Sequence, residues 1–317
     1  MSSPADTSPD PSRRWWASLE LVRLPNLFTA VADVLMGVLF VRAIAGAADA
    51  CMLGLLVVAS TLLYASGVVL NDLFDYQRDL AERPDRPLPS GRLSRQFARR
   101  LGTALLTAGV AIALPAAWLA GDFRPAVAAG ALAACILLYD VWLKRTLLGP
   151  PAMGACRMFN VLLGMSVAGS PWQSQHWLVA GAVGIYITGV TWFARNEVCP
   201  GGRLQLALAT GVLLSGIALL ARLPDHAADR LVPVLKQQPE RWRLMMLFLG
   251  VLIGWRCLRA VLNPVPARVQ TAVKLCILSL VVLDAAACYA VRGTSWAVAI
   301  LLLLAPAVVL GQWIRST

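Results

Sequence analysis

The sequence predicts an all-α protein that crosses a lipid bilayer many times. Of its 317 residues, 58% are hydrophobic and only 14% are charged, and the mean hydropathy is +0.68. A soluble domain is about half apolar and about a quarter charged, so this composition requires a non-aqueous solvent. The apolar runs are long and continuous, and a spanning helix takes about 20 such residues. Because backbone groups inside a bilayer must pair within the chain, helices are the predicted spanning elements.

Polar connections divide the chain into ten apolar segments, and nine spans is the alternative because the pairing of the last three is ambiguous. Residues 1–14 are rich in Ser, Pro and Asp and lack an apolar run, which predicts a disordered tail. Residues 15–317 are predicted to form a single transmembrane domain. The predicted spans are 27–46, 52–72, 101–120, 125–143, 151–169, 175–195, 204–222, 242–261, 270–290 and 295–314.

The basic residues predict the orientation of the spans. They concentrate in the connections after the second, fourth and sixth spans, whereas the connections after the first and fifth spans contain no Lys or Arg. Cytoplasmic loops carry an excess of Lys and Arg, so the even-numbered connections are predicted to be cytoplasmic. We expect an integral, multi-pass protein of the plasma or inner membrane. The same rule accounts for the net charge of +11, so we infer no nucleic-acid partner.

The second span ends in the sequence NDLFDYQRD, which contains Asn71, Asp72, Asp75 and Asp79. At about 100° per residue, these four side chains share about a third of the helix circumference. Three carboxylates on one face repel each other, and a divalent cation relieves that repulsion. Mg²⁺ takes carboxylate oxygens together with phosphate oxygens of a substrate. We therefore predict that the four residues are catalytic and that the three aspartates bind Mg²⁺, with a solvated acidic helix end as the alternative.

A basic, proline-rich stretch follows this acidic helix end. It contains Arg83, Arg86 and Arg92 on a backbone that three prolines stiffen. The forked donors of arginine suit phosphate oxygens, so these three side chains are predicted to contact a diphosphate. The alternative is topology alone, because cytoplasmic loops are basic anyway.

Several ionisable residues lie within or at the ends of other spans. Such residues are costly in a bilayer and usually face a cavity or a charged partner. Arg157 is predicted to bind substrate, and the alternative is an ion pair, for which Asp33 and Asp284 are candidate partners. Asp140 and Lys144 are four residues apart, which is the spacing of an ion pair along one helix.

The run from Asn71 to Ser94 resembles the first aspartate-rich signature of the UbiA prenyltransferase superfamily. That signature reads Asn-Asp-x-x-Asp-x-x-x-Asp and is followed by an Arg-Pro-Leu-x-Ser-Gly loop, which residues 86–91 match. Residues 139–145 look like the family's basic connection after the fourth span, which implies a diphosphate contact for Lys144. The resemblance extends over most of the chain from about Arg23.

The resemblance implies both a fold and an activity. The fold is a UbiA-like helical bundle whose central cavity opens to the cytoplasm. The activity is Mg²⁺-dependent transfer of a prenyl group from a prenyl diphosphate to an acceptor, with release of diphosphate. The sequence identifies neither the acceptor nor the length of the prenyl chain.

The chain departs from the family where a second aspartate motif is expected, after the sixth span. Residues 193–198 read FARNEV there, so Glu197 is the only carboxylate and the predicted remaining metal ligand. Arg195 is predicted to supply positive charge near the diphosphate in place of a second metal ion. This segment and the first span are similar to the EboC-like branch of the superfamily. The number of bound Mg²⁺ ions, one or two, stays open.

Three other functions are alternatives. The lost second motif is compatible with a non-catalytic membrane protein that binds a prenyl lipid. A CDP-alcohol phosphotransferase also uses clustered aspartates, but the Asp-Gly and Ala-Arg pairs of that pattern are missing between Asp72 and Asp79. A transporter is the weakest alternative, because the two halves of the chain show no matching interrupted helices.

Overall fold

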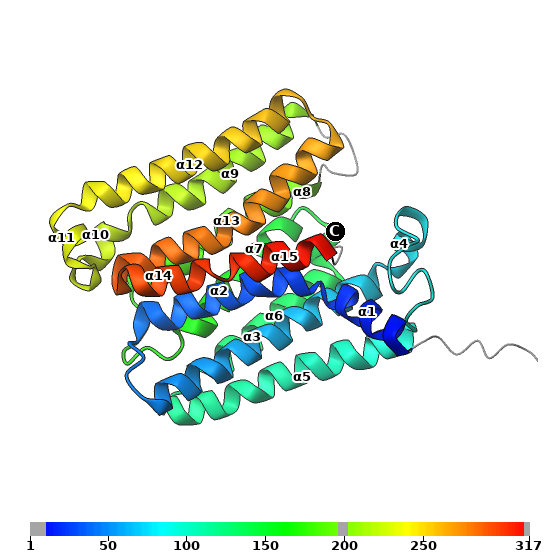
Figure 1. Cartoon of the computed structure of the whole chain (residues 1–317), viewed down its shortest axis with the longest axis horizontal. Helices are drawn as coiled ribbons and strands as arrows, with labels where there is room; N and C mark the ends of the chain where they lie inside the picture. Colours follow the sequence, from blue (N-terminus) through cyan, green and yellow to red (C-terminus); the bar gives the residue numbers. More distant parts are fainter. Residues whose placement is uncertain (1–10, 196–201, 314–317) are drawn as a thin grey trace, which may run out of the picture.

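The computed structural model describes residues 11–195 and 202–313. Every regular element in those residues is a helix, which confirms the all-α prediction, and Figure 1 shows the long helices side by side in one bundle. The helices are α1 (Pro11–Val22), α2 (Leu24–Val41), α3 (Ala47–Phe74), α4 (Tyr76–Glu82), α5 (Arg95–Ala120), α6 (Arg124–Val141), η1 (Leu143–Arg145), α7 (Gly149–Met165), α8 (Ser174–Ala194), α9 (Arg203–Leu220), α10 (Leu223–Ala227), η3 (Ala228–Arg230), α11 (Pro233–Gln237), α12 (Pro239–Leu262), α13 (Pro266–Arg292), α14 (Thr294–Leu301) and α15 (Leu304–Trp313).

Nine helical segments in the described part of the chain are long and apolar enough to cross a membrane. They comprise α2, α3, α5, α6, α8, the combined segment from α9 to η3, α12, α13 and the combined segment of α14 and α15. The 17-residue helix α7 corresponds to the predicted fifth span. The segments occur in the predicted order, which confirms an integral membrane bundle of nine or ten spans. The last span is interrupted after α14 because Pro306 cannot bond to the carbonyl of Leu302 four residues earlier.

Two helices begin earlier than the sequence predicts. Helix α1 begins at Pro11, inside the segment 1–14 that is predicted to be a disordered tail. Helix α5 begins at Arg95, ahead of the predicted start at residue 101. The hydroxyl of Ser94 accepts a hydrogen bond from the N–H of Phe97 at 3.1 Å, which caps the first turn of α5. Hydropathy places the start too late because the first turns of α5 are basic.

Helices α2 and α7 lie at the centre of the bundle. Side chains of α8, α9, α12 and α13 form one buried apolar cluster, and side chains of α3, α5 and α6 form most of a second. Residues of α2 and α7 belong to both clusters. A polar side chain on the inner face of either helix is therefore surrounded by protein rather than by lipid.

Helices α2 and α7 pack backbone to backbone at Gly37 and Gly164. A Cβ atom at Gly37 would lie 2.6 Å from the carbonyl oxygen of Val161, so only glycine fits at this crossing. Small residues allow such close approach between membrane helices. The crossing places Asp33, one turn before Gly37, beside Arg157 of α7.

Candidate active site at the end of α3

The predicted aspartate motif spans the junction between α3 and α4. Asp75 separates the two helices with φ −91° and ψ 4°, yet the hydrogen bonds continue through it. The N–H of Asp75 donates to the carbonyl of Asn71 at 3.0 Å, and the N–H of Asp79 donates to that of Asp75 at 2.9 Å. The motif therefore keeps its helical spacing, although it does not lie on one continuous helix.

Asp72 and Asp79 form the first pair of the motif and share one arginine. Nη1 of Arg86 lies 2.8 Å from Oδ2 of Asp79 and 3.3 Å from Oδ1 of Asp72. Nη2 of Arg23 lies 2.8 Å from the same Oδ1 of Asp72. Both carboxylates are buried, so the two guanidinium groups supply the positive charge that water does not. The predicted residues Arg86, Asp72 and Asp79 are thus brought together.

Arg23 is a site residue that the sequence reasoning missed. It precedes α2 in a left-handed conformation, with φ 51° and ψ 53°. Within the described chain it is the one residue other than glycine with a positive φ. That conformation costs about 1 kcal/mol or more and persists only where contacts hold it, as the ion pair with Asp72 does here. The available signal was a basic residue directly before the proline-initiated first span.

Asn71 and Asp75 form the second pair and share Lys144. Nζ of Lys144 lies 2.8 Å from Oδ1 of Asp75 and 3.2 Å from Oδ1 of Asn71. Lys144 reaches them from η1, because Trp142 (φ −134°, ψ −57°) ends α6 and turns the chain. The break also removes the helical register between Lys144 and Asp140, so the lysine pairs with Asp75 instead.

Arg78 lies inside the motif but is directed away from it. Its Nε donates to Glu82 at 2.9 Å along α4. That hydrogen bond raises the pKa of Arg78, with smaller contributions from Asp75 and Asp79. The aspartates therefore depend on basic groups from other parts of the chain for their neutralisation.

Arg195 contacts the turn that carries Lys144. Its Nη2 donates to the carbonyl oxygens of Lys144 and Thr146, each at 2.8 Å. The guanidinium group packs on Gly149 so closely that a Cβ atom there would collide with Nη2. Arg195 thus holds η1 against the end of α8.

Arg157 contacts a buried carboxylate in the middle of the bundle. Its Nη1 lies 2.8 Å from Oδ2 of Asp33, and its Nη2 donates to the hydroxyl of Thr29 at 2.8 Å. The amide of Asn160 donates to Oδ2 of Asp33 at 2.9 Å. The ion pair with Asp33, which the sequence offers as the alternative, is present.

The remaining predicted site residues lie apart from the motif or outside the described chain. Arg92 donates to both carboxylate oxygens of Glu20 on α1, at 2.6 and 3.1 Å. Arg83 ends α4 and is half-buried. Glu197, the predicted ligand from the degraded second motif, lies outside the described residues, as does Asn196 beside it.

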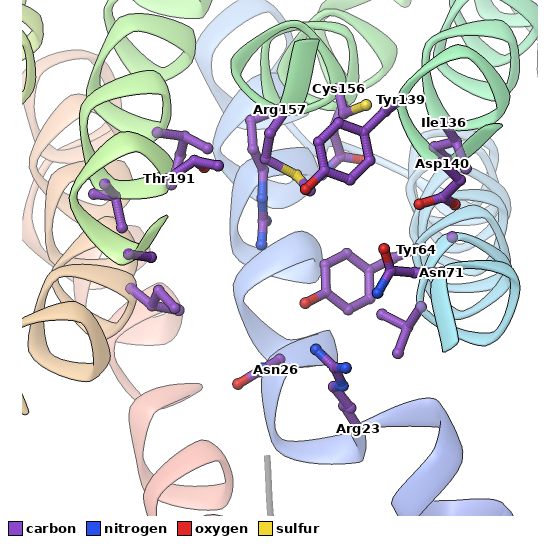
Figure 2. Close-up of a pocket in the computed structure, with 18 of the residues that line it drawn as sticks. Arg23, Asn26, Tyr64, Asn71, Ile136, Tyr139, Asp140, Cys156, Arg157 and Thr191 are labelled. Carbon is purple, nitrogen blue, oxygen red and sulfur yellow. The ribbon is translucent and has the colours of Figure 1, made fainter. Parts of the chain in front are cut away.

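A cavity of 340 Å³ extends from the motif into the bundle between α2, α3, α6, α7, α8 and α13. Arg23, Asn71 and Asp140 line it at helix ends, and Arg157 lines it at mid-span, as Figure 2 shows. Elsewhere the walls are mostly apolar. Small-molecule sites combine such walls with a few converging polar groups. The apolar side chains of the lining are Val68, Leu132, Ile136, Met153, Ile187, Val190, Ala194, Val273 and Ile277.

The motif suits a metal ion that arrives together with a phosphate ligand. In the described part of the chain, no three His, Cys, Asp or Glu side chains are grouped closely enough to hold a metal ion by themselves. Mg²⁺ typically binds through one or two carboxylates plus substrate phosphates, so the oxygen donors here fit it. Oδ2 of Asp140, which is buried and has no hydrogen-bond partner among the residues that the structure describes, adds a further oxygen donor at the cavity.

The chain is similar in sequence to known membrane enzymes. The profile described as the UbiA prenyltransferase family matches residues 31–316. The digeranylgeranylglyceryl phosphate synthase of Ignicoccus hospitalis is 30% identical over 192 residues, which cover 58% of each chain. That of Sulfolobus acidocaldarius is 34% identical over 124 residues, which cover 39% of this chain and 42% of the relative. The matches thus span about half the length of these curated relatives.

Solved structures share the fold. A UbiA homologue from Archaeoglobus fulgidus bound to GPP and Mg²⁺ superposes with a TM-score of 0.65 at 13% identity, covering 90% of this chain and 99% of that chain. A structure described for digeranylgeranylglyceryl phosphate synthase gives a TM-score of 0.62 at 19% identity, covering 91% and 99%. At these identities the likeness shows the fold alone.

Proposed function

The chain belongs to the UbiA prenyltransferase family, as its motif indicated, and on that premise we propose that it transfers a prenyl group from a prenyl diphosphate to an acceptor. The observation that carries the proposal is the cluster at the mouth of the cavity. There, Asn71, Asp72, Asp75 and Asp79 meet three basic side chains from separate parts of the chain. Such a cluster accommodates both the negative charge of a diphosphate and a cation bound to it.

The basic groups of the cluster would bind the leaving diphosphate. Arg23, Arg86 and Lys144 now neutralise the aspartates. A diphosphate offers the same kind of oxygen acceptors, so each cation can exchange a carboxylate for a phosphate oxygen. These cations would then stabilise the charge that develops on the leaving group.

The aspartates would hold Mg²⁺ once the basic groups turn to the diphosphate. Asp72, Asp75 and Asp79, with Asn71, supply the oxygen donors that this ion prefers. When bound, the ion supplies further positive charge to the departing diphosphate. The exchange of partners keeps the cluster near neutrality with and without ligand, which limits the electrostatic cost of burial.

The cavity would hold the prenyl chain and exclude water. Ile136, Ile187, Val273 and Ile277 line it with aliphatic surface. As the bond between the allylic carbon and the diphosphate oxygen breaks, that carbon becomes cationic and is open to capture by water. Because apolar walls exclude water, an acceptor bound in the same cavity is the nucleophile that remains available.

The proposal puts the cluster on the cytoplasmic side of the plasma or inner membrane. The connection after the second span, which carries the motif and its arginines, is the most basic of the chain. The curated relatives are named digeranylgeranylglyceryl phosphate synthase, and this chain matches about half their length. A lipid acceptor is therefore the first class to test.

The experiment is to measure diphosphate release by the purified protein in detergent. Geranylgeranyl diphosphate and a crude extract of lipids and quinone precursors would be supplied with and without Mg²⁺. Release that requires Mg²⁺ and disappears in Asp72→Ala supports a working prenyltransferase. Donor binding without release, across several donors, would instead support a non-catalytic prenyl-lipid-binding protein.

A further inference from the structure

Asp140 is a fourth carboxylate at the mouth of the cavity, outside the signature motif. It lies in the last turn of α6, is 2% exposed and lines the cavity. Within the described residues its Oδ2 has no hydrogen-bond partner. Figure 2 shows its carboxylate and the amide of Asn71 directed toward the same space. A buried carboxylate oxygen without a partner is unfavourable and indicates a missing ligand.

The charges around Asp140 belong to the proposed active site. The charged groups that act on it are Lys144, Asp75, Asp72 and Arg23. Lys144, the nearest basic group along the chain, has its ammonium on Asp75 and Asn71. Asp140 therefore lacks a counter-charge of its own, although it adjoins a cluster in which the other aspartates have one.

Binding of a diphosphate would increase this imbalance. If Lys144 moves to a phosphate oxygen, Asp75 loses its ion pair with Lys144 and becomes, like Asp140, a carboxylate without a counter-charge. A divalent cation offsets both charges, and it needs no more than two carboxylates when phosphate oxygens complete its shell.

We propose that Asp140 is a ligand of a divalent cation bound with the diphosphate, and that it supplies the carboxylate lost from the degraded second aspartate motif. The inference rests on the proposed function and adds to it a residue outside the signature. Among the motif residues, Asp75 has the strongest electrostatic effect on Asp140, so Asp75 is the motif carboxylate that would share the cation with it.

The test is metal affinity rather than turnover. Mn²⁺ would be titrated into purified protein with geranyl S-thiolodiphosphate, a non-reactive donor analogue, and free Mn²⁺ followed by electron paramagnetic resonance. Loss of groups that only support a metal ligand costs about ten- to a hundredfold in affinity, so loss of a direct ligand in Asp140→Asn should weaken Mn²⁺ binding at least about tenfold. Asp140→Ser, which also removes the carboxylate, should do the same.

Asp284→Asn is the matched control. Asp284 is also fully buried, and neither of its carboxylate oxygens has a partner in the described chain, but it does not line the cavity. The Asp284→Asn variant should bind Mn²⁺ with the same affinity as the unsubstituted protein. Equal Mn²⁺ affinity in Asp140→Asn, Asp140→Ser and the unsubstituted protein would overturn the assignment of Asp140 and leave the proposed function standing. If the unsubstituted protein binds the analogue but takes up no Mn²⁺ with it, the proposed metal-dependent function fails, and this inference fails with it.

Discussion

Two groups of aspartates in this protein differ in their access to water. The end cluster contains Asp72, Asp75 and Asp79 and lies at the junction of α3 and α4. The mid-span cluster contains Asp33 and Asp284 and lies between α2, α7 and α13. In the end cluster the side chains of Arg23 and Asp75 are 23% and 22% exposed. In the mid-span cluster both aspartates are completely buried.

This difference separates exchangeable ion pairs from fixed ones. At the end cluster, water can solvate the partly exposed carboxylate of Asp75 while Lys144 moves to a ligand, so this ion pair can be exchanged at small cost. At mid-span, a separated ion would remain in a low-dielectric interior, where an unpaired charge is strongly unfavourable. The end cluster is thus suited to binding a charged substrate, and the mid-span cluster is suited to holding α2 and α7 in place.

The largest expected effect is on stability, from Arg157→Met. Removing this guanidinium leaves Asp33 uncompensated in the bundle interior, and breaking a buried pair in this way costs about 3–5 kcal/mol. The thermal unfolding midpoint in detergent should fall markedly. Arg92→Ala breaks an exposed pair with Glu20 and should cost less than about 1 kcal/mol. Similar midpoints for the two variants would show that the buried pair of Arg157 and Asp33 contributes no more to stability than an exposed pair does.

The next effect is on catalysis, from Asp75→Ala. This carboxylate is partly exposed and paired with Lys144, so its loss leaves the fold intact. Because it is a proposed metal ligand, Mg²⁺-dependent diphosphate release should fall at least about a hundredfold, as for loss of one strong transition-state contact. Release and the unfolding midpoint should be measured on the same preparation. Unchanged release would contradict the assignment of the end cluster as the active site.

The sequence predicts the motif but not its partners, for a physical reason. Hydropathy and the spacing of Asn71, Asp72 and Asp75 are local properties, so spans and motif follow from neighbouring residues. The contact of Arg23 with Asp72 joins residues 49 positions apart, and it depends on which helix ends meet.

The spacing of Asp140 and Lys144 shows that a local pattern can also predict a contact that does not form. The spacing is correct for a helical ion pair, but the turn at Trp142 removes the required register. That Oδ2 of Asp140 has no partner in the described chain becomes visible only once α3 and α6 are packed together.

Two arginines of the loop after α4 provide a sharper comparison. Arg86 bridges Asp72 and Asp79, whereas Arg92 bonds to Glu20 on α1. Arg86→Ala should raise the KM for prenyl diphosphate about tenfold, the effect of losing one charge-assisted contact. Arg92→Ala should change KM less than about twofold, because the guanidinium of Arg92 already pairs with Glu20 at the surface. Equal increases would mean that the loop acts by its overall charge rather than through individual contacts.

The smallest effect is expected from Arg195→Lys, because Arg195 acts on the end cluster through Lys144. A lysine keeps the charge, but its flexible stem lacks the rigid, planar guanidinium group whose Nη2 donates to the carbonyls of both Lys144 and Thr146. Weaker support of η1 should lower kcat/KM about three- to tenfold, since one hydrogen bond is worth about 1 kcal/mol. Gly149→Ala should give a similar loss, because the added methyl group displaces the guanidinium.

A double-substitution cycle separates this positioning role from direct contact with the diphosphate. In a Lys144→Met background, η1 no longer carries a cation to be positioned, so Arg195→Lys should have no further effect on kcat/KM. An independent, additive loss would show that Arg195 contacts the diphosphate itself, as its position in the sequence predicts. That result would extend the end cluster from α3 to the end of α8. It would also mean that the position of the degraded second motif takes part in binding the diphosphate.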